Sequence, residues 1–310
     1  MQAKPLTLRV VRELLLDKNS AHAHLSAASG MWIASGTLYV VADDALELGV
    51  FAMNSTLPGH TLTIIPGTLP SDAKLRKAAK PDFESLTFIP ASEHYPFGAL
   101  LAFGSGSTEQ RKRGMIWPFN AQHKLVNKPQ IFDLKALYEP LEQIFSDLNI
   151  EGALMQGGCL KLWQRANNQH RDNAVIEYDV ADLYALIHAK PQNNLNLQPQ
   201  HIERYDLGEV EGIPLTFTDA FALPDGTCLF SAAAENTDNS YADGECVGAA
   251  IGLIDQQRQL RWIRPVNPTY KIEGISAQQQ VSQLQIWLVS DADNPNVAAK
   301  LLETTIDYSL

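Results

Sequence analysis

Four carboxylates open apolar segments that lie far apart in the sequence. Glu84 stands in "PDFESLT", Glu151 in "LNIEGAL", Asp219 in "FTDAFALPDG" and Glu273 in "YKIEGIS". A charge beside apolar residues is costly to bury unless it is paired or coordinates a cation. Acids that are brought together either share protons, which raises their pKa values, or bind a cation. An oxygen-only ligand set favours a hard ion, and Ca²⁺ tolerates more flexible coordination than Mg²⁺. These four acids therefore predict a calcium site.

The acids belong to a repeat. Five units begin near Ser29, Glu84, Glu151, Asp219 and Glu273, at spacings of 55, 67, 68 and 54 residues. Each unit has an apolar strand, a turn, a second strand rich in Leu, Val, Phe or Trp, and a third strand after a polar loop. Short strands that recur in this way predict a β-propeller with blades of four antiparallel strands.

Five blades are the preferred number, and a sixth, degenerate blade is the alternative. The fifth unit ends before its fourth strand, while residues 6–14 ("LTLRVVREL") alternate like a strand and precede the first unit. We expect this N-terminal strand to close the ring, which would leave no open blade edge. A β-sandwich is disfavoured because five units in the same order are more than one sandwich contains. The whole chain, residues 1–310, is expected to form one domain.

Two segments interrupt the strand pattern. Residues 133–148 ("DLKALYEPLEQIFSDL") and 179–190 ("DVADLYALIHAK") each open with Asp, a residue that caps helices, and continue with apolar residues at helical spacing. Pro140 suits the first turn of a second short helix. These segments predict short helices that connect strands at the rim.

A second set of polar residues follows the second strand of each unit. It consists of Asp43, Ser105, Arg165, Glu235 and Asp291. Adjacent blade strands are antiparallel, so the end of the second strand lies beside the start of the first. Both sets should therefore share one face of the ring. Arg165, the one cation of the set, could neutralise the acids or hold a phosphate or carboxylate of a ligand.

Structural explanations stand beside these functional ones. Each acid could cap the start of its own strand or pair with a basic neighbour such as Lys271. The second set could be ordinary hairpin residues, since Asp-rich segments are typical of turns. The recurrence of an acid in four of the five units favours a shared site.

Composition limits the remaining possibilities. The net charge of -11 argues against nucleic acid as a partner. No stretch approaches the length of a membrane span, and the N-terminus has no signal-peptide core. Three scattered cysteines indicate reduced thiols, so we expect a cytoplasmic protein. The basic run of residues 111–113 is expected to be a solvated hairpin tip.

The repeated strand head, an apolar residue and an acid followed by Gly or Ser, together with "IWLVSDADNP", resembles the phytase-like and SdiA-regulated-like bacterial propellers. It is more distantly similar to the calcium-dependent lactonase and phosphotriesterase propellers. This resemblance implies a metal-bearing funnel that hydrolyses a phosphoester or a lactone. Glu84, Glu151, Asp219 and Glu273 carry the implication for the metal.

Two functional hypotheses follow. In the first, the protein is a metal-dependent hydrolase: the metal polarises the substrate, Glu235 or Asp291 is the general base, and Arg165, Asp43, Ser105 and Ser29 contact a small-molecule ligand. In the second, the ring is a non-catalytic scaffold that binds a ligand or a protein. Fold alone does not choose between them, because propellers host both.

Overall fold

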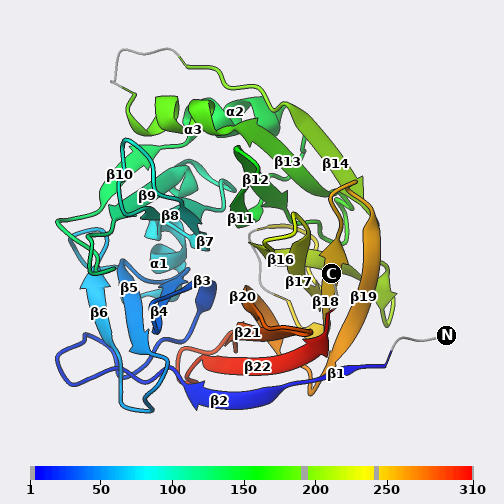
Figure 1. Ribbon diagram of the computed structural model, residues 1–310, viewed down its shortest axis with the longest axis horizontal. Coiled ribbons are helices and arrows are strands. Elements are labelled where there is room, and N and C mark those ends of the chain that lie inside the picture. The colour runs from blue at the N-terminus through cyan, green and yellow to red at the C-terminus, as the bar shows by residue number, and fades with distance from the viewer. Residues whose placement is uncertain (1–3, 190–194, 241–243, 309–310) are drawn as a thin grey trace.

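The computed structural model describes residues 4–189, 195–240 and 244–308. Five antiparallel sheets stand around a central axis, as the sequence predicts, and the chain visits them in order (Figure 1). The protein is therefore a five-bladed β-propeller, with the first strand of each blade nearest the axis and the fourth at the rim.

The strands of the blades have the following bounds. Blade 1 comprises β3 (Ala28–Ala34), β4 (Thr37–Ala42), β5 (Glu47–Ala52) and β6 (His60–Thr63). Blade 2 comprises β7 (Phe83–Ile89), β8 (Ala99–Gly104), β9 (Arg113–Pro118) and β10 (Gln130–Asp133). Blade 3 comprises β11 (Ile150–Gln156), β12 (Cys159–Gln164), β13 (Asn173–Asp179) and β14 (His201–Tyr205). Blade 4 comprises β16 (Ile213–Ala222), β17 (Cys228–Glu235), β18 (Cys246–Ile254) and β19 (Leu260–Asn267), with the short β15 (Glu209–Val210) beside β16. Blade 5 comprises β20 (Lys271–Gln279), β21 (Gln283–Asp291), β22 (Lys300–Asp307) and β2 (Arg9–Glu13).

The N-terminal segment closes the ring, which confirms the expectation from the sequence. β2 pairs antiparallel with β22 and is the outer strand of blade 5. The preceding β1 (Leu6–Thr7) pairs in parallel with β19 of blade 4. The segment predicted as one strand thus joins two neighbouring blades, so that the two ends of the chain hold the ring together.

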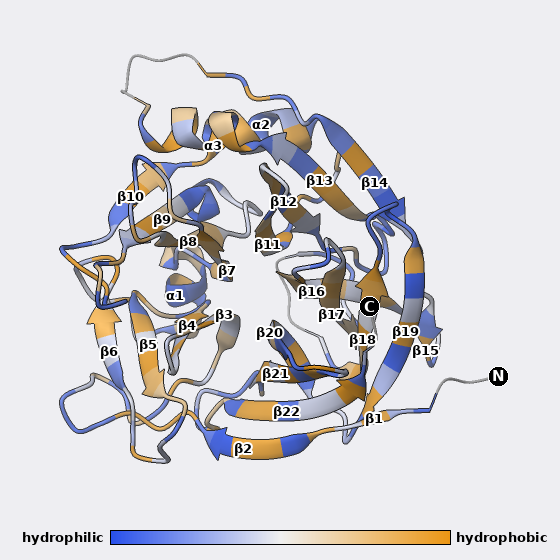
Figure 2. Cartoon of the chain, viewed as in Figure 1, coloured by the Kyte–Doolittle hydropathy of each residue, from blue (hydrophilic) through white to orange (hydrophobic). Residues whose placement is uncertain are grey.

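The core lies between the blades. Five apolar clusters fill the spaces between neighbouring sheets, and Trp163 of blade 3, for example, packs against Phe217 of blade 4 with ring centroids 4.6 Å apart. Every residue of β8 and β17 is buried, because these strands have a neighbouring blade on each face. Outer strands such as β2 and β14 carry both hydrophilic and hydrophobic residues (Figure 2).

Three short helices are present in the described ranges. α2 (Lys135–Glu142) and α3 (Val180–Ile187) confirm the two predicted connectors and pack at the rim of blades 2 and 3 (Figure 1). Pro140 lies inside α2 instead of starting a second helix, and the carbonyl of Ala136 that it leaves without an amide accepts a hydrogen bond from Leu197 N at 3.0 Å. No described helix has the length and apolar character needed to traverse a bilayer.

The sequence did not reveal α1 (Ala73–Ala79), which begins after Asp72; the Asp72 side chain accepts a hydrogen bond from Leu75 N. Its residues are mostly exposed, so it lacks the apolar stripe by which helices are recognised. This helix lies beside the axis at the edge of blades 1 and 2 (Figure 1). The side chains of its last turn consequently reach the centre of the ring.

The expectation of a solvated tip at residues 111–113 is wrong for two of the three residues. Arg111 and Lys112 are only 3% and 4% exposed, because a short 3₁₀ turn (Glu109–Arg111) folds the tip back onto the ring. Lys112 pairs with Glu109 at 2.6 Å and with Glu142 of α2 at 2.7 Å. Buried cations are paired in this way because an isolated buried charge is too costly.

Candidate functional site

The first strand of every blade carries a β-bulge, and in blades 2, 3 and 5 the bulge falls on the repeated acid. The register shifts between Phe83 and Ser85, between Ile150 and Gly152 and between Ile272 and Gly274, so Glu84, Glu151 and Glu273 are the unpaired bulge residues. A bulge adds one residue to the strand and re-aims its side chain. The acids can therefore leave the apolar face of the strand and point to the axis.

The glycine after the acid has a separate role. A Cβ on Gly274 would lie 2.5 Å from the carbonyl oxygen of Ser29, and one on Gly152 would lie 3.1 Å from Cα of Asp219. The inner strands of adjacent blades thus pack backbone to backbone at this level. The "EG" pair combines a side chain that faces the axis with a residue small enough for close packing of the blades.

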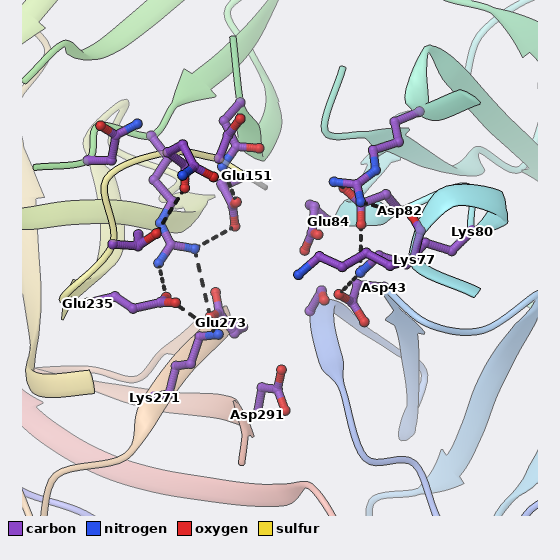
Figure 3. A pocket seen from close by; sticks show the side chains of 18 of the residues that line it. Asp43, Lys77, Lys80, Asp82, Glu84, Glu151, Glu235, Lys271, Glu273 and Asp291 are labelled. Atoms are coloured by element: carbon purple, nitrogen blue, oxygen red, sulfur yellow. Dashed lines mark hydrogen bonds and ion pairs between the residues drawn. The ribbon is translucent and has the colours of Figure 1, made fainter. Parts of the chain in front are cut away.

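The predicted residues converge on one narrow pocket at the axis, with a volume of about 60 Å³, which we call the axial pocket (Figure 3). Eight of the ten predicted site residues line it: Ser29, Asp43, Glu84, Glu151, Arg165, Glu235, Glu273 and Asp291. They come from all five blades, as radial symmetry requires. Asp82, Lys80, Lys77, Arg111 and Lys271 also line the pocket.

Two predicted residues, Asp219 and Ser105, lie outside it. In blade 4 the register shift falls between Phe217 and Asp219, so Thr218 holds the bulge position. Asp219 is one residue further on, and its Oδ2 accepts a hydrogen bond from Ile275 N of blade 5 at 3.0 Å. A one-residue slip turns a side chain to the other face of a strand. Ser105 is fully buried behind the pocket wall, where its hydroxyl donates to Asp82 Oδ2 at 2.5 Å.

Arg165 organises one side of the axial pocket. Its Nη1 lies 3.3 Å from Glu151 Oε2 and 4.0 Å from Glu273 Oε1, and its Nη2 pairs with Glu235. Lys271 Nζ lies 3.5 Å from both Glu235 and Glu273. Two cations therefore face three carboxylates on this side, which we call the arginine cluster.

Burial and pairing set the pKa values within the arginine cluster. Burial acts to raise the pKa of the Glu235 carboxyl, but Arg165 and Lys271 outweigh burial, and the pKa is lowered. Burial also raises the pKa of Glu273, which stays well above its usual range despite Lys271 and Arg165. The geometry agrees, since the Oε2 of Glu273 is buried without a hydrogen-bond partner in the described part of the chain.

The opposite side holds a second group, the lysine cluster, which sequence reasoning missed apart from Asp43 and Glu84. Lys80 Nζ pairs with Asp43 and lies 2.8 Å from Asp82 Oδ1, while Arg111 Nη1 lies 2.8 Å from Asp82 Oδ2. Figure 3 shows this group across the pocket from the arginine cluster. The one available signal in the sequence was the Lys80–Pro81–Asp82 triplet directly before the Glu84 strand.

Glu84 differs from the other carboxylates of the lysine cluster. It forms no hydrogen bond or ion pair within the described residues, and burial followed by repulsion from Glu151, Asp82 and Asp43 raises its pKa well above the usual range. One oxygen each of Asp43, Asp82 and Glu84 lie within 4.8 Å of one another. These three oxygens are close enough to contact one cation together.

The predicted calcium ligands consequently divide. Glu151 and Glu273 face Arg165, and Asp219 faces the backbone of blade 5. Only Glu84 of the original four belongs to the group of oxygens that converge. The donors Asp43, Asp82 and Glu84 match a hard cation in kind, and the ammonium group of Lys80 competes with such an ion for two of them. Calcium binding itself stays a prediction.

Asp291 lies between the two clusters (Figure 3). Burial raises its pKa to about 7, with Lys271 acting in the opposite direction and Asp293 and Asp43 adding to the rise. Its Oδ1 accepts a hydrogen bond from Asp293 N at 2.8 Å. A carboxyl group with such a pKa can both take up and release a proton near neutral pH.

Similar folds occur among solved structures. The catalytic domain of the GH62 α-L-arabinofuranosidase from Coprinopsis cinerea shares 10% identity at a TM-score of 0.54, and the alignment covers 97% of each chain. The glutaminyl cyclase of Myxococcus xanthus shares 10% identity at a TM-score of 0.48, over 98% of this chain and all of that one. At such low identity the first likeness shows the fold alone. No curated protein sequence matches the chain. The family of unknown function DUF6929 matches residues 24–306, and the protein therefore belongs to this family.

Proposed function

We propose that the axial pocket is the active site of a metal-dependent hydrolase of small phosphoesters or lactones. The observation that carries the proposal is the division of the carboxylates in one pocket. Those of the arginine cluster contact Arg165 and Lys271, whereas Glu84 has no hydrogen bond or ion pair within the described residues and Asp291 has a pKa of about 7. Carboxylates whose environments move their pKa values apart are typical of acid–base catalysis.

Asp291 is the general base in this proposal. Glu235, the other candidate from the sequence, is occupied on both oxygens, because Oε2 contacts Arg165 and Oε1 accepts a hydrogen bond from Gly244 N at 2.6 Å. Asp291 borders the pocket with a carboxylate that is available near neutral pH, and it can remove a proton from a water molecule that attacks the substrate.

Asp43, Asp82 and Glu84 are the residues that would hold the cation. Calcium bound there supplies Lewis-acid polarisation of a carbonyl or phosphoryl oxygen and a more acidic water. Lys80 has the corresponding role in the protein without the ion, since it neutralises Asp43 and Asp82. Binding of the cation therefore requires Lys80 to release these carboxylates. The resemblance to phytase-like or lactonase-like propellers stays a prediction, which rests on the repeated sequence at the start of the strands.

The rise in melting temperature that calcium causes tests the cation site, because two variants should change this rise in opposite directions. Glu84→Gln removes one donor, so the rise in melting temperature caused by calcium should shrink. Lys80→Met removes the competing ammonium group and leaves Asp43 and Asp82 short of positive charge, so the rise should grow. Glu209→Gln, at an exposed pair with Arg171, is the matched control and should respond as the unaltered protein does.

Turnover is tested on panels of phosphoesters and lactones with and without calcium. Calcium-stimulated hydrolysis that Asp291→Asn abolishes is the expected result. If calcium leaves the melting temperatures of all variants unchanged and no substrate turns over, the hydrolase proposal is wrong, and the pocket serves the non-catalytic binding role instead.

A further inference from the structure

The axial pocket is too small to hold a whole substrate. Its volume is about 60 Å³, whereas pockets that enclose small organic ligands measure about 300–1,000 Å³. Only a reacting group fits between the arginine and lysine clusters. The remainder of a substrate must therefore lie in a hollow that adjoins the axial pocket.

Two hollows share more than one wall residue with the axial pocket, and a third, between blades 3 and 4, shares only Ala166. The first, which we call the middle hollow, has a volume of about 190 Å³ and shares five residues with it: Asp43, Lys77, Lys80, Lys271 and Asp291. The second, the blade 5 hollow, has a volume of about 410 Å³ and shares only Lys271 and Asp291. The middle hollow thus has the broader boundary with the axial pocket.

The middle hollow leads outward to a larger pocket at the rim of blade 1. This rim pocket has a volume of about 640 Å³ and shares Ser26, Asp44, Arg76 and Pro295 with the middle hollow. Its wall is mostly apolar and includes Leu16, Leu46, Leu69 and Pro70. The three hollows form a row from the axis to the rim.

The character of the walls changes along this row. The axial pocket and the middle hollow share the charged residues Lys77, Lys80, Asp43, Lys271 and Asp291, whereas the wall of the rim pocket is mostly apolar and carries its charges at Asp44, Glu47 and Arg76. Apolar walls that stay in contact with water are costly, and an apolar group that covers them is bound favourably. A ligand that matches the row is polar at one end and apolar at the other.

We propose that the substrate is an amphipathic ester or lactone whose apolar end occupies the rim pocket while its hydrolysable group lies in the axial pocket. The position of the reacting group rests on the proposed function; the position of the apolar end rests on the row of hollows. Each methylene group placed in the rim pocket should strengthen binding about fourfold, as expected for its transfer out of water. This gain should stop when the chain fills the pocket.

The test is calorimetric binding of γ-lactones whose unbranched side chain is extended from methyl to octyl. It uses the Asp291→Asn protein, so that binding is measured without turnover. Leu69→Asp, added to this protein, places a charge in the rim pocket and should abolish the dependence of Kd on chain length. Leu69 is partly exposed and lies outside every helix and strand of the described chain, so the core stays intact. Leu69→Ala should weaken the dependence without introducing a charge.

Two control variants complete the design. Val297→Asp alters the blade 5 hollow, and Leu57→Asp alters a residue that is 73% exposed; both should keep the dependence on chain length. If Val297→Asp abolishes it and Leu69→Asp does not, or if no protein shows it, the inference is overturned. If the unaltered protein hydrolyses the lactones but their binding does not depend on chain length, the inference is also overturned, and the hydrolase proposal stands. If binding depends on chain length and Leu69→Asp abolishes this dependence, but no lactone is hydrolysed, the position of the apolar end is supported and the hydrolase proposal is wrong.

Discussion

Arg165 Nη1 lies 3.3 Å from Glu151 Oε2, and both side chains are almost completely buried. Arg165 also contacts Glu235 and Glu273, so one guanidinium group serves carboxylates from three blades. Replacing one partner of a buried ion pair leaves an uncompensated charge, which costs far more than the pair contributes. The pocket therefore depends on Arg165 for its stability.

The first prediction concerns Arg165→Met. We expect the free energy of unfolding to fall by about 3–5 kcal/mol in urea titrations at neutral pH. The loss should be smaller at acidic pH, because the carboxylates left without a cation then take up protons in the folded state. Arg171→Met is the control, since Arg171 and Glu209 form an exposed pair at 2.6 Å, and it should cost about 1 kcal/mol or less. Equal losses for both variants would contradict the role of Arg165.

The second prediction concerns the pH dependence of hydrolysis. Asp291 must be a carboxylate to act as a base, so kcat/KM should rise with pH and level off above an apparent pKa of about 7. Asp291→Asn should lose this rise together with most of the activity. Asp172→Asn, at an exposed pair with Arg204, should keep the profile of the unaltered protein. If kcat/KM is the same below and above pH 7, Asp291 is not the base.

The third prediction concerns two arginines of the closing strand β2. The Arg12 side chain donates to the carbonyl oxygens of Ser55 and Leu57 at 2.6 Å each and covers the ring of Phe51 at 5.4 Å. Arg12→Ala should therefore lower the free energy of unfolding by about 1.5–3 kcal/mol, the range for hydrogen bonds to a charged group.

Arg9→Ala is the matched control on the same strand. Arg9 pairs with Glu303 while its side chain is 68% exposed, so its loss should cost about 1 kcal/mol or less. Urea unfolding of both variants under the same conditions checks the pair of expectations. If the two losses are alike, the attachment of β2 to blade 1 through Arg12 contributes nothing particular to ring closure.

The positions of Glu84, Glu151 and Glu273 at the axis were within reach of the sequence, because each opens an apolar strand at the same point of a repeat. Asp219 shows the limit of that reasoning. Its strand has the bulge at Thr218, one residue earlier, and no feature of the sequence marks which residue of a strand is left unpaired. The bulge position depends on hydrogen bonds to the neighbouring strand, which exist only after the blade has formed.

The cations that pair with the acids of the lysine cluster could not be predicted from the sequence, for a similar reason. Lys80 comes from a helix end and pairs with Asp43 because blades 1 and 2 meet at the axis. Arg111 comes from a hairpin tip of blade 2 and reaches Asp82 because that tip folds back onto the start of the same blade. Composition and local sequence pattern predict that such residues are exposed to solvent. Their burial follows from charge pairing across long sequence distances, which outweighs the local preference for water.

The sequence by itself determined the repeat, favoured five blades, and indicated the strand that closes the ring and three of the acids at the axis, because each of these depends on local periodicity. The tertiary structure decided which acids share the pocket, which of them are neutralised and which cations do so. Those outcomes depend on distances of a few ångströms between blades, and electrostatic energy changes steeply over such distances when water is excluded.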